Sequence, residues 1–546
     1  MKPGCDVLII GGYEVSEHLN GMGEAAKNWL RFMGKPASLY FLANLVDCDG
    51  DLEAAAGRLA AANPMHGLGW PLGAVYLLDF LGKQGLSVEG VGYYAYEQDR
   101  FRELAAARPC VVAISTTFIT EAAQIGEIAR AIKAVSPNTI VVAGGAKILK
   151  SHREYRLWRE GRFEGCDIAP MAANNPFFPE ARLPEVDAFV IADAGETTLL
   201  DVFRAVKSGA DLSRVSNLAF MGDDGPELTP RVEELNHFAR HAISWDRIPD
   251  GVAGLEIPVR GGVGCPFRCA FCDFTGLHRN VRSRPLDGIL NELRSINDVF
   301  PDRRVFFTDD NLFASPKRIH ELCGAIIENG LQLSWRAFFR ADAIDETGAE
   351  LLARAGCHTA LLGVESGDDS ILANMRKRSC RDTILRAIRL LDRYSVDTLS
   401  TMIVGFPGET CRSVDATIDL LNAYPHTGRA IHRYLSFVFV SLPLAPASMP
   451  EFRHEHRLKG LYLDWTHDTM TRPEAERELR RVFEEVDGPT LQYPDYPSAD
   501  LPGPVLYDLL RTRDDLVKRG VSEIDTANAR MIAETFRPIL ARVAAA

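Results

Sequence analysis

The 546-residue chain lacks any apolar run approaching the ~20 residues that a helix needs to cross a bilayer. The apolar core of its first stretch, "MKPGCDVLIIGGYEVSEHL", is short, so we expect a first β-strand there rather than a secretory signal. The chain also lacks a basic excess. Its net charge of −13 argues against binding along a nucleic-acid backbone, although a local basic pocket remains compatible with it. We therefore expect a cytoplasmic globular protein with no membrane and no nucleic-acid partner.

Disulfides are also not expected, because the eleven cysteines are odd in number and no secretion signal precedes them. Eight are scattered and are interpreted as small buried residues. The other three, Cys265, Cys269 and Cys272, lie within "GGVGCPFRCAFCDF", with no fourth cysteine nearby. Zinc would require a fourth Cys or His at short spacing, whereas three thiolates can hold three irons of a cubane and leave one iron open. A zinc site or a chance grouping remains the alternative.

Two series of alternating strand and helix patterns predict an α/β protein. Residues 1 to about 210 contain buried apolar strands such as "CVVAISTTF" and "TIVVAGGAKI", separated by amphipathic helices. This pattern predicts a doubly wound, Rossmann-like parallel sheet, whose ligands bind at the carboxyl ends of the strands. A second series of about six βα units begins near residue 255 and predicts a (β/α)6 partial TIM barrel. The predicted domains are 1–212, a linker at 213–250, the barrel at 251–445, and a small, mostly helical region at 446–546.

The spacing Cys-x3-Cys-x-aromatic-Cys, with Phe271 as the aromatic residue, resembles the radical S-adenosylmethionine (SAM) superfamily. In that family three cysteines hold a [4Fe-4S] cluster, and SAM chelates the fourth iron. The resemblance continues through "FFTDDNLF", "FFRADAI", "LLGVESGDD" and "MIVGFPGET", each at a strand end. It implies that these ends contact SAM through Phe271, Asp309, Arg340, Glu365, Ser366 and Gly405. The family's Gly-Gly-Glu tripeptide is absent, and "TDDN", which includes Asn311, stands in its place.

One residue in the cysteine loop bears on the open iron. Asp273 directly follows Cys272, and its carboxylate could compete with SAM for that iron. We expect Asp273 to point away and to form a local hydrogen bond.

The first 212 residues resemble the cobalamin-binding (B12-binding) domain that precedes the barrel in one branch of this superfamily. The matching pieces are "MHGLGWPLGAVYLLDFLGKQG", "VVAISTTF", "VVAGGAKI" and "IADAGETTLLDVF". The resemblance implies cobalamin contacts at Ser115, Thr116, Thr117, Gly144, Gly145, Gly195 and Glu196. An ordinary doubly wound domain without a corrin is the alternative.

Cobalamin proteins that use a histidine as the lower cobalt ligand carry Asp-x-His-x-x-Gly. This chain has "SEHLNG" instead, with Ser16 at the aspartate position. The carboxylate that normally orients such a histidine is missing. His18 is therefore interpreted as a loop residue rather than a cobalt ligand.

Together the two resemblances imply a class B, cobalamin-dependent radical SAM methyltransferase. Such an enzyme moves a methyl group from SAM through cobalamin to an unactivated carbon, or to phosphinate phosphorus, of a small molecule in natural product biosynthesis. An external electron donor such as flavodoxin or ferredoxin would supply electrons. A radical SAM enzyme that catalyses a rearrangement, cyclisation or dehydration is the alternative, and an iron–sulfur redox or sensor protein is the remote one.

The C-terminal region is expected to determine substrate specificity. Its stretch "YLDWTHDTM" concentrates aromatic and polar groups, and its candidate catalytic residues are Tyr462 and His467. The stretch could line a pocket, or it could dock its aromatic face on the barrel.

Overall fold

The computed structural model describes residues 5–14, 28–61, 67, 69–234, 242–277, 281–492, 501 and 503–544. These residues belong to two compact units. Unit 1 comprises described residues of 1–20, 69–254 and 273–302, and unit 2 comprises those of 21–68, 255–272 and 303–546. None of the described helices is long and apolar enough to span a bilayer.

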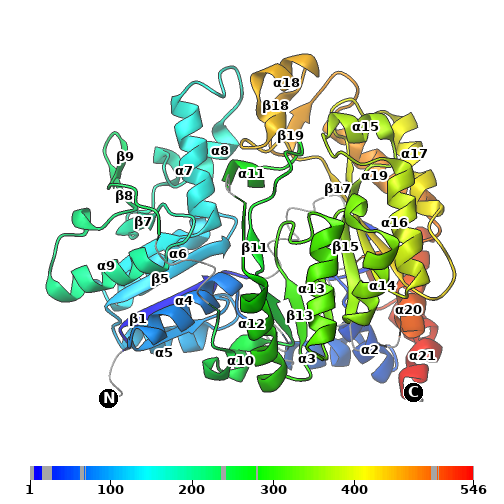
Figure 1. Ribbon diagram of the computed structural model, residues 1–546, viewed down its shortest axis with the longest axis horizontal. Helices are drawn as coiled ribbons and strands as arrows, with labels where there is room; N and C mark the ends of the chain where they lie inside the picture. The colour runs from blue at the N-terminus through cyan, green and yellow to red at the C-terminus, as the bar shows by residue number, and fades with distance from the viewer. Residues whose placement is uncertain are drawn as a thin grey trace. The chain divides into compact units, whose positions relative to one another are not determined.

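Unit 1 contains a seven-stranded sheet with the order β4-β1-β5-β6-β7-β8-β9 (Figure 1). The strands are β1 (Val7–Gly12), β4 (Val88–Val91), β5 (Val111–Phe118), β6 (Ile140–Gly144), β7 (Ala188–Val190), β8 (Leu218–Gly222) and β9 (Gly225–Leu228). The first five in spatial order are parallel, and the chain moves outward from β1 in both directions. The predicted doubly wound sheet is confirmed, and its switch point lies between β1 and β5.

The central strands β1 and β5 form because they are rich in apolar residues that are buried on both faces of the sheet. The first six residues of β5 are all buried. The helix α4 ends at Lys83, shortly before Gly85, which adopts a left-handed φ of 82°. The helices of unit 1 are α4 (Leu72–Lys83), α5 (Gln98–Ala106), α6 (Ala122–Val135), α7 (Ala146–Arg159), α8 (Ala169–Ala173), α9 (Glu196–Ser208), α10 (Asp250–Ala253), α11 (Phe274–Leu277) and α12 (Leu286–Val299).

The predicted linker at 213–250 has more structure than its turn-rich composition suggests. It contains β8 and β9, which pair antiparallel and extend the sheet of unit 1. Gly222, Gly225 and Pro226 lie within these two strands, and such short edge strands give a weak sequence signal. Residues 235–241 of the linker lie outside the described residues.

Unit 2 contains a second seven-stranded sheet, all parallel, with the order β10-β13-β14-β15-β16-β17-β20. Its strands are β10 (Glu256–Val259), β13 (Arg304–Phe307), β14 (Trp335–Phe339), β15 (Cys357–Glu365), β16 (Asp397–Val404), β17 (His432–Val438) and β20 (Thr490–Leu491). Six of them follow in chain order, as a partial barrel requires. The seventh, β20, comes from the C-terminal region.

Burial alternates along β16, where every second residue is fully buried. Helices including α13, α14, α16 and α17 cover the outer side of this sheet (Figure 1), and α16 contacts β16. The helices of unit 2 are α2 (Leu39–Asp47), α3 (Leu52–Ala61), α13 (Pro316–Glu328), α14 (Glu346–Arg354), α15 (Asp369–Asn374), α16 (Arg381–Arg393), α17 (Cys411–Asn422), α18 (Pro450–Glu455), α19 (Arg472–Glu485), α20 (Gly503–Lys518) and α21 (Ala529–Ala544).

Residues 28–61 lie within the predicted first domain but belong to unit 2. In that unit α2 packs against α21, and Arg537 pairs with Asp49 at 2.6 Å. The short strands β2 (Arg31–Phe32), β3 (Lys35–Pro36) and β21 (Glu523–Ile524) form a small sheet. No local pattern could reveal this association, because the partners lie more than 400 positions apart.

Candidate functional site

The cysteine loop follows β10 and the short strand β11 (Gly262–Val263) of unit 2. Cys269 is buried, whereas Cys265 and Cys272 are partly exposed. Gly264 has a left-handed φ of 87°, which lets the chain turn sharply into the loop. All eleven cysteines lie among the described residues, and none forms a disulfide. None of the three sulfurs of the loop is therefore consumed by a disulfide.

The donor set fits an iron–sulfur cluster better than a single metal ion. No group of three His, Cys, Asp or Glu side chains in the described part of the chain could hold one ion. Cubane ligands need not converge on one point, because each thiolate binds a different iron. The Asn311 amide donates to the Cys265 sulfur at 3.7 Å, a contact of the kind that tunes such clusters. Burial raises the pKa of the Cys269 thiol, and the nearby cations of Lys377 and Arg340 oppose that rise.

Arg340, predicted to contact SAM, is engaged by groups of its own unit. Its guanidinium forks onto the Asp342 carboxylate at 2.9 and 3.2 Å and donates to the backbone carbonyl of Lys377. It also stacks on the Phe267 ring, 3.8 Å from its centroid. Arg340 thus ties the cysteine loop to β14 and to the segment after α15.

Glu365, at the end of β15, forms a buried ion pair that the sequence analysis missed. Its Oε1 lies 2.8 Å from the Lys377 ammonium, and its Oε2 accepts from Thr401 at 3.3 Å. Lys377 also lies over the Phe271 ring at 5.7 Å. Glu365 has a left-handed φ of 72°, a strained conformation for a non-glycine residue. Lys377 gave no sequence signal, because the basic run "MRKRS" resembles an ordinary solvated surface.

Asp309 is a buried carboxylate at the end of β13. Its Oδ2 accepts from the Gly261 backbone N–H at 2.8 Å, which fixes the entry to the cysteine loop. Its Oδ1 is buried with no hydrogen-bond partner. Burial raises the pKa of Asp309 to about 6, and backbone N–H groups of the loop oppose that rise. Ser366 is fully buried, and its hydroxyl accepts from the Asp368 backbone at 3.2 Å, within the turn before α15.

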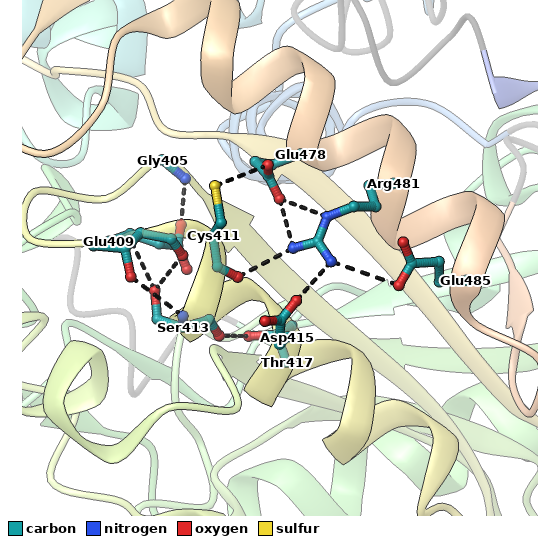
Figure 2. Close-up of polar contacts among 10 residues, drawn as sticks. Gly405, Glu409, Cys411, Ser413, Asp415, Thr417, Glu478, Arg481 and Glu485 are labelled. Carbon is teal, nitrogen blue, oxygen red and sulfur yellow. Dashed lines mark hydrogen bonds and ion pairs between the residues drawn. The ribbon is translucent and has the colours of Figure 1, made fainter.

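Gly405 ends β16 in a crowded turn with a φ of 87°. A Cβ at this position would lie 2.5 Å from Ala475 and 2.7 Å from the Trp465 ring. The backbone N–H of Gly405 donates to the fully buried Glu409 carboxylate, as Figure 2 shows. Burial raises the pKa of Glu409 to about 8. The sequence analysis quoted "GFPGET" without singling out this acid.

Of the two candidate catalytic residues, His467 contacts the same turn. His467 is buried and its Nε2 lies 3.1 Å from the Gly405 carbonyl oxygen, while its ring stacks on Trp465. Burial lowers the pKa of His467, which favours the neutral ring. Tyr462 pairs with Ser441 through the backbone. The sequence left two arrangements open for this stretch: it could line a pocket, or it could dock its aromatic face on the barrel. Trp465 and His467 take the docked arrangement.

The predicted cobalamin residues lie at neighbouring strand ends of unit 1. Ser115, Thr116 and Thr117 lie in the second half of β5, Gly144 is the last residue of β6 and Gly145 follows it, and Gly195 directly precedes Glu196, the first residue of α9. Thr116 is buried and donates to the Gly144 carbonyl at 2.9 Å, so its hydroxyl is used internally.

The hydroxyls of Ser115 and Thr117, the other two in this group, suit a cofactor with polar groups at its edge. A Cβ on Gly73 of α4 would lie 3.5 Å from the Ser115 hydroxyl and 3.9 Å from that of Thr117. Glycines and small hydroxyls thus surround the switch point, where open sheets bind ligands. His18 lies outside the described residues, so its interpretation as a loop residue stays a prediction.

Asp273 does not have the local partner that we expected, and that prediction was wrong. Its carboxylate pairs with Lys150 of α7 at 2.8 Å, within unit 1. The partner lies more than 120 positions earlier in the chain, so no local pattern could indicate it.

Comparison with known proteins identifies the two cofactor-binding segments. Residues 259–421 match the radical SAM superfamily, and residues 60–163 match the B12 binding domain. An uncharacterized methyltransferase of Pyrococcus horikoshii is 25% identical over 312 residues, which are 55% of this chain and 67% of that protein. An anaerobic magnesium-protoporphyrin IX monomethyl ester cyclase of Synechocystis is 26% identical over 233 residues, 41% of this chain and 46% of the cyclase. The chain thus spans about half to two thirds of these relatives.

A solved structure shares the fold over most of the chain. It is the radical SAM methyltransferase TsrM of Kitasatospora setae with cobalamin and a [4Fe-4S] cluster bound. The TM-score is 0.59 at 16% identity, covering 88% of this chain and 98% of TsrM. At 16% identity, the similarity to TsrM establishes the shared fold alone.

Proposed function

The chain belongs to the radical SAM enzymes that carry a B12-binding domain, and on that premise we propose that it is a methyltransferase. The methyl group would pass from SAM, through cobalamin, to a carbon or to phosphinate phosphorus of a small molecule. The observation that carries this proposal is the combination of a three-cysteine loop, lacking a fourth cysteine ligand, with a cobalamin-binding segment in one chain.

The cofactors would supply the chemistry: electron transfer and radical formation from the cluster with SAM, and methyl carriage from cobalamin. The chain's own residues hold the loop and orient the ligands. Arg340 and Asp309 fix the cysteine loop from two sides. The Lys377–Glu365 pair lies beside Phe271, where an ammonium and a carboxylate can meet the opposite charges of an amino acid group.

A small-molecule substrate agrees with the acidic composition of the chain, which carries a net charge of −13. TsrM has also been solved with tryptophan substrate and a SAM analogue, which supports the same class of substrate here. An external one-electron donor is part of the proposal, since reducing a cluster requires one. The absence of disulfides among the eleven cysteines suits a reducing compartment such as the cytoplasm.

A non-methylating reaction is the second candidate, and the resemblance to the cyclase is the observation that favours it. The two candidates differ in the fate of SAM. A methyltransferase releases S-adenosylhomocysteine in a cobalamin-dependent reaction, whereas a rearrangement or cyclisation releases 5′-deoxyadenosine alone.

The test therefore needs no identified substrate. The reconstituted protein is incubated anaerobically with SAM and a reductant, with and without cobalamin, and the products are measured by mass spectrometry. We expect S-adenosylhomocysteine in an amount equal to the bound cobalamin, and only when cobalamin is present. Formation of 5′-deoxyadenosine with no cobalamin-dependent S-adenosylhomocysteine would favour the second candidate.

A further inference from the structure

A basic region of unit 2 adjoins the cysteine loop of the same unit. Residues 376–393 carry seven arginine and lysine residues against two aspartates, in a chain whose net charge is −13. Five arginines of this region and of the loop are exposed and are called the arginine surface below: Arg268, Arg376, Arg378, Arg386 and Arg389. Among the described residues, none of these five guanidinium groups has an ion-pair or hydrogen-bond partner.

The segment 375–378 is hydrogen-bonded to the cysteine loop. The Ala270 backbone N–H donates to the Met375 carbonyl at 2.8 Å. Arg340, which stacks on the Phe267 ring of the loop, donates to two carbonyls of the same segment. The backbone that carries two arginines of the surface therefore lies directly against the loop that would hold the cluster.

The three consecutive cations of this segment divide between the interior and the solvent. Lys377 is buried and pairs with Glu365 at 2.8 Å. Arg376 and Arg378 are exposed, and their φ angles of 54° and 53° are left-handed. Such a conformation is costly for a residue other than glycine, and it persists only where the surrounding structure enforces it. The fold thus maintains a strained backbone with one cation inside and two at the surface.

Arg386 and Arg389 lie one turn apart on α16 and line a pocket of about 580 Å³. The acidic residues of this pocket are engaged by other side chains: Asp342 with Arg340 at 2.9 Å, Asp345 with His320 at 2.9 Å and Glu346 with Arg393 at 2.6 Å. Arg386 and Arg389 therefore add positive charge that no neighbouring carboxylate balances through an ion pair.

Unbalanced positive charge on an acidic chain attracts an anionic partner from a distance. Arginine suits such contacts, because its guanidinium is weakly hydrated and binds a carboxylate through two hydrogen bonds. The place of the surface beside the cysteine loop indicates which partner this is. The proposed function requires an external electron donor, and complexes between electron-transfer proteins are small and guided by complementary charge. A nucleic acid would also be attracted by arginines, but it would have no reason to bind beside the cluster loop.

We propose that the arginine surface docks a small acidic protein that carries single electrons, such as a reduced flavodoxin. This inference rests on the proposed cluster chemistry. The guanidinium groups hold carboxylates of the carrier and take no part in the reaction. One electron leaves the carrier and enters the cluster, so that the carrier is oxidised by one electron, the cluster is reduced by one, and no covalent bond forms or breaks.

The test measures the binding of an oxidised acidic flavodoxin to the full chain, before and after the cluster is reconstituted. The variant Arg386→Gln/Arg389→Gln removes two cations of the surface. The control variant Arg429→Gln/Arg519→Gln removes the same charge from two exposed arginines that follow α17 and α20 and form no ion pair with the described residues. Because all four side chains are exposed and unpaired, both variants should melt at the wild-type temperature.

We expect wild-type binding to weaken as ionic strength rises, because salt screens exposed charges. Arg386→Gln/Arg389→Gln should bind flavodoxin about three- to tenfold more weakly, with or without the cluster, and the control should match the wild type. Reduction of the reconstituted cluster by reduced flavodoxin should slow by a similar factor. Reduction by photoreduced deazariboflavin, a small uncharged reagent that needs no docking, should be unchanged.

Three results would overturn the proposal: no binding of flavodoxin to the wild type, wild-type affinity in Arg386→Gln/Arg389→Gln, or equal weakening in the control. A single-stranded RNA that binds the wild type more tightly than flavodoxin, and is lost in the same variant, would also overturn it, since the surface would then serve a nucleic acid. The proposed function fails separately, if the chemically reduced wild type forms no cobalamin-dependent S-adenosylhomocysteine.

Discussion

Single buried ionisable residues define the candidate SAM site, and Glu409 gives the clearest test of them. Burial raises its pKa to about 8, so the folded protein keeps it protonated at neutral pH while the unfolded chain does not. The folded state then binds one more proton than the unfolded state between roughly pH 4.5 and 8. In this window the stability of the wild type should fall as pH rises, by up to about 1.4 kcal/mol per pH unit from this group.

Replacing Glu409 by Gln keeps an acceptor for the Gly405 N–H but removes the titration. We expect Glu409→Gln to gain stability relative to the wild type as pH rises from 6 to 8. Chemical denaturation at several pH values measures this directly. Parallel stability curves for the two proteins would show that Glu409 does not change its protonation on folding.

Substitutions of His467 test whether the turn at Gly405 positions SAM. Because His467 contacts the Gly405 carbonyl and stacks on Trp465, His467→Ala should loosen this turn and weaken SAM binding, while iron content stays unchanged. His467→Gln retains a side-chain amide near the carbonyl and should restore part of the affinity. Calorimetric titration with SAM checks both variants. Unchanged affinity in His467→Ala would remove the turn from the SAM site.

At the scale of elements, α19 packs against α17, β16 and β17 through a buried apolar face that includes Leu479 and Phe483, and one arginine adds polar contacts to this packing. Figure 2 shows the Arg481 guanidinium reaching Asp415 at 2.6 Å, Glu478 at 2.7 Å and the Cys411 carbonyl at 3.1 Å. These partners lie on α17 and on α19 itself. The side chain of Arg481 is only 26% exposed, so its contacts are partly shielded from solvent.

Arg481→Ala should therefore destabilise the protein by about 1–2 kcal/mol. Its neighbour Arg480 serves as the control, since it pairs only with Glu484 at 3.0 Å and is 54% exposed. Arg480→Ala should change stability by less than about 0.5 kcal/mol. Urea denaturation of both variants measures the difference, and equal effects would contradict the assigned role of Arg481.

The sequence predicted the individual helices and strands better than it predicted the contacts between distant segments. The apolar runs of β5 and β6 and the spacing of α4 are local signals, and both parallel sheets follow from them. The packing of α2 against α21, and the addition of β20 to the barrel sheet, depend on contacts between distant segments. Periodicity carries no information about such contacts.

The residues of the candidate site also divide into those with a local sequence signal and those without one. The three cysteines and the strand-end residues could be predicted, because their spacing is a local property. Lys377, Lys150 and Glu409 could not, because each acquires its role from a partner or from burial that only the folded chain supplies. Tertiary structure also changes what the predicted residues contact: Arg340 binds Asp342 and Phe267 of its own unit.

At the scale of the whole molecule, we propose that one chain holds both an iron–sulfur cluster and cobalamin. Anaerobic reconstitution with iron, sulfide and hydroxocobalamin, followed by desalting and a visible spectrum, tests this claim most directly. We expect the wild type to retain both chromophores, and the variant with Cys265, Cys269 and Cys272 replaced by alanine to retain only the corrin. A wild type that keeps the cluster but releases all of the corrin would contradict the account.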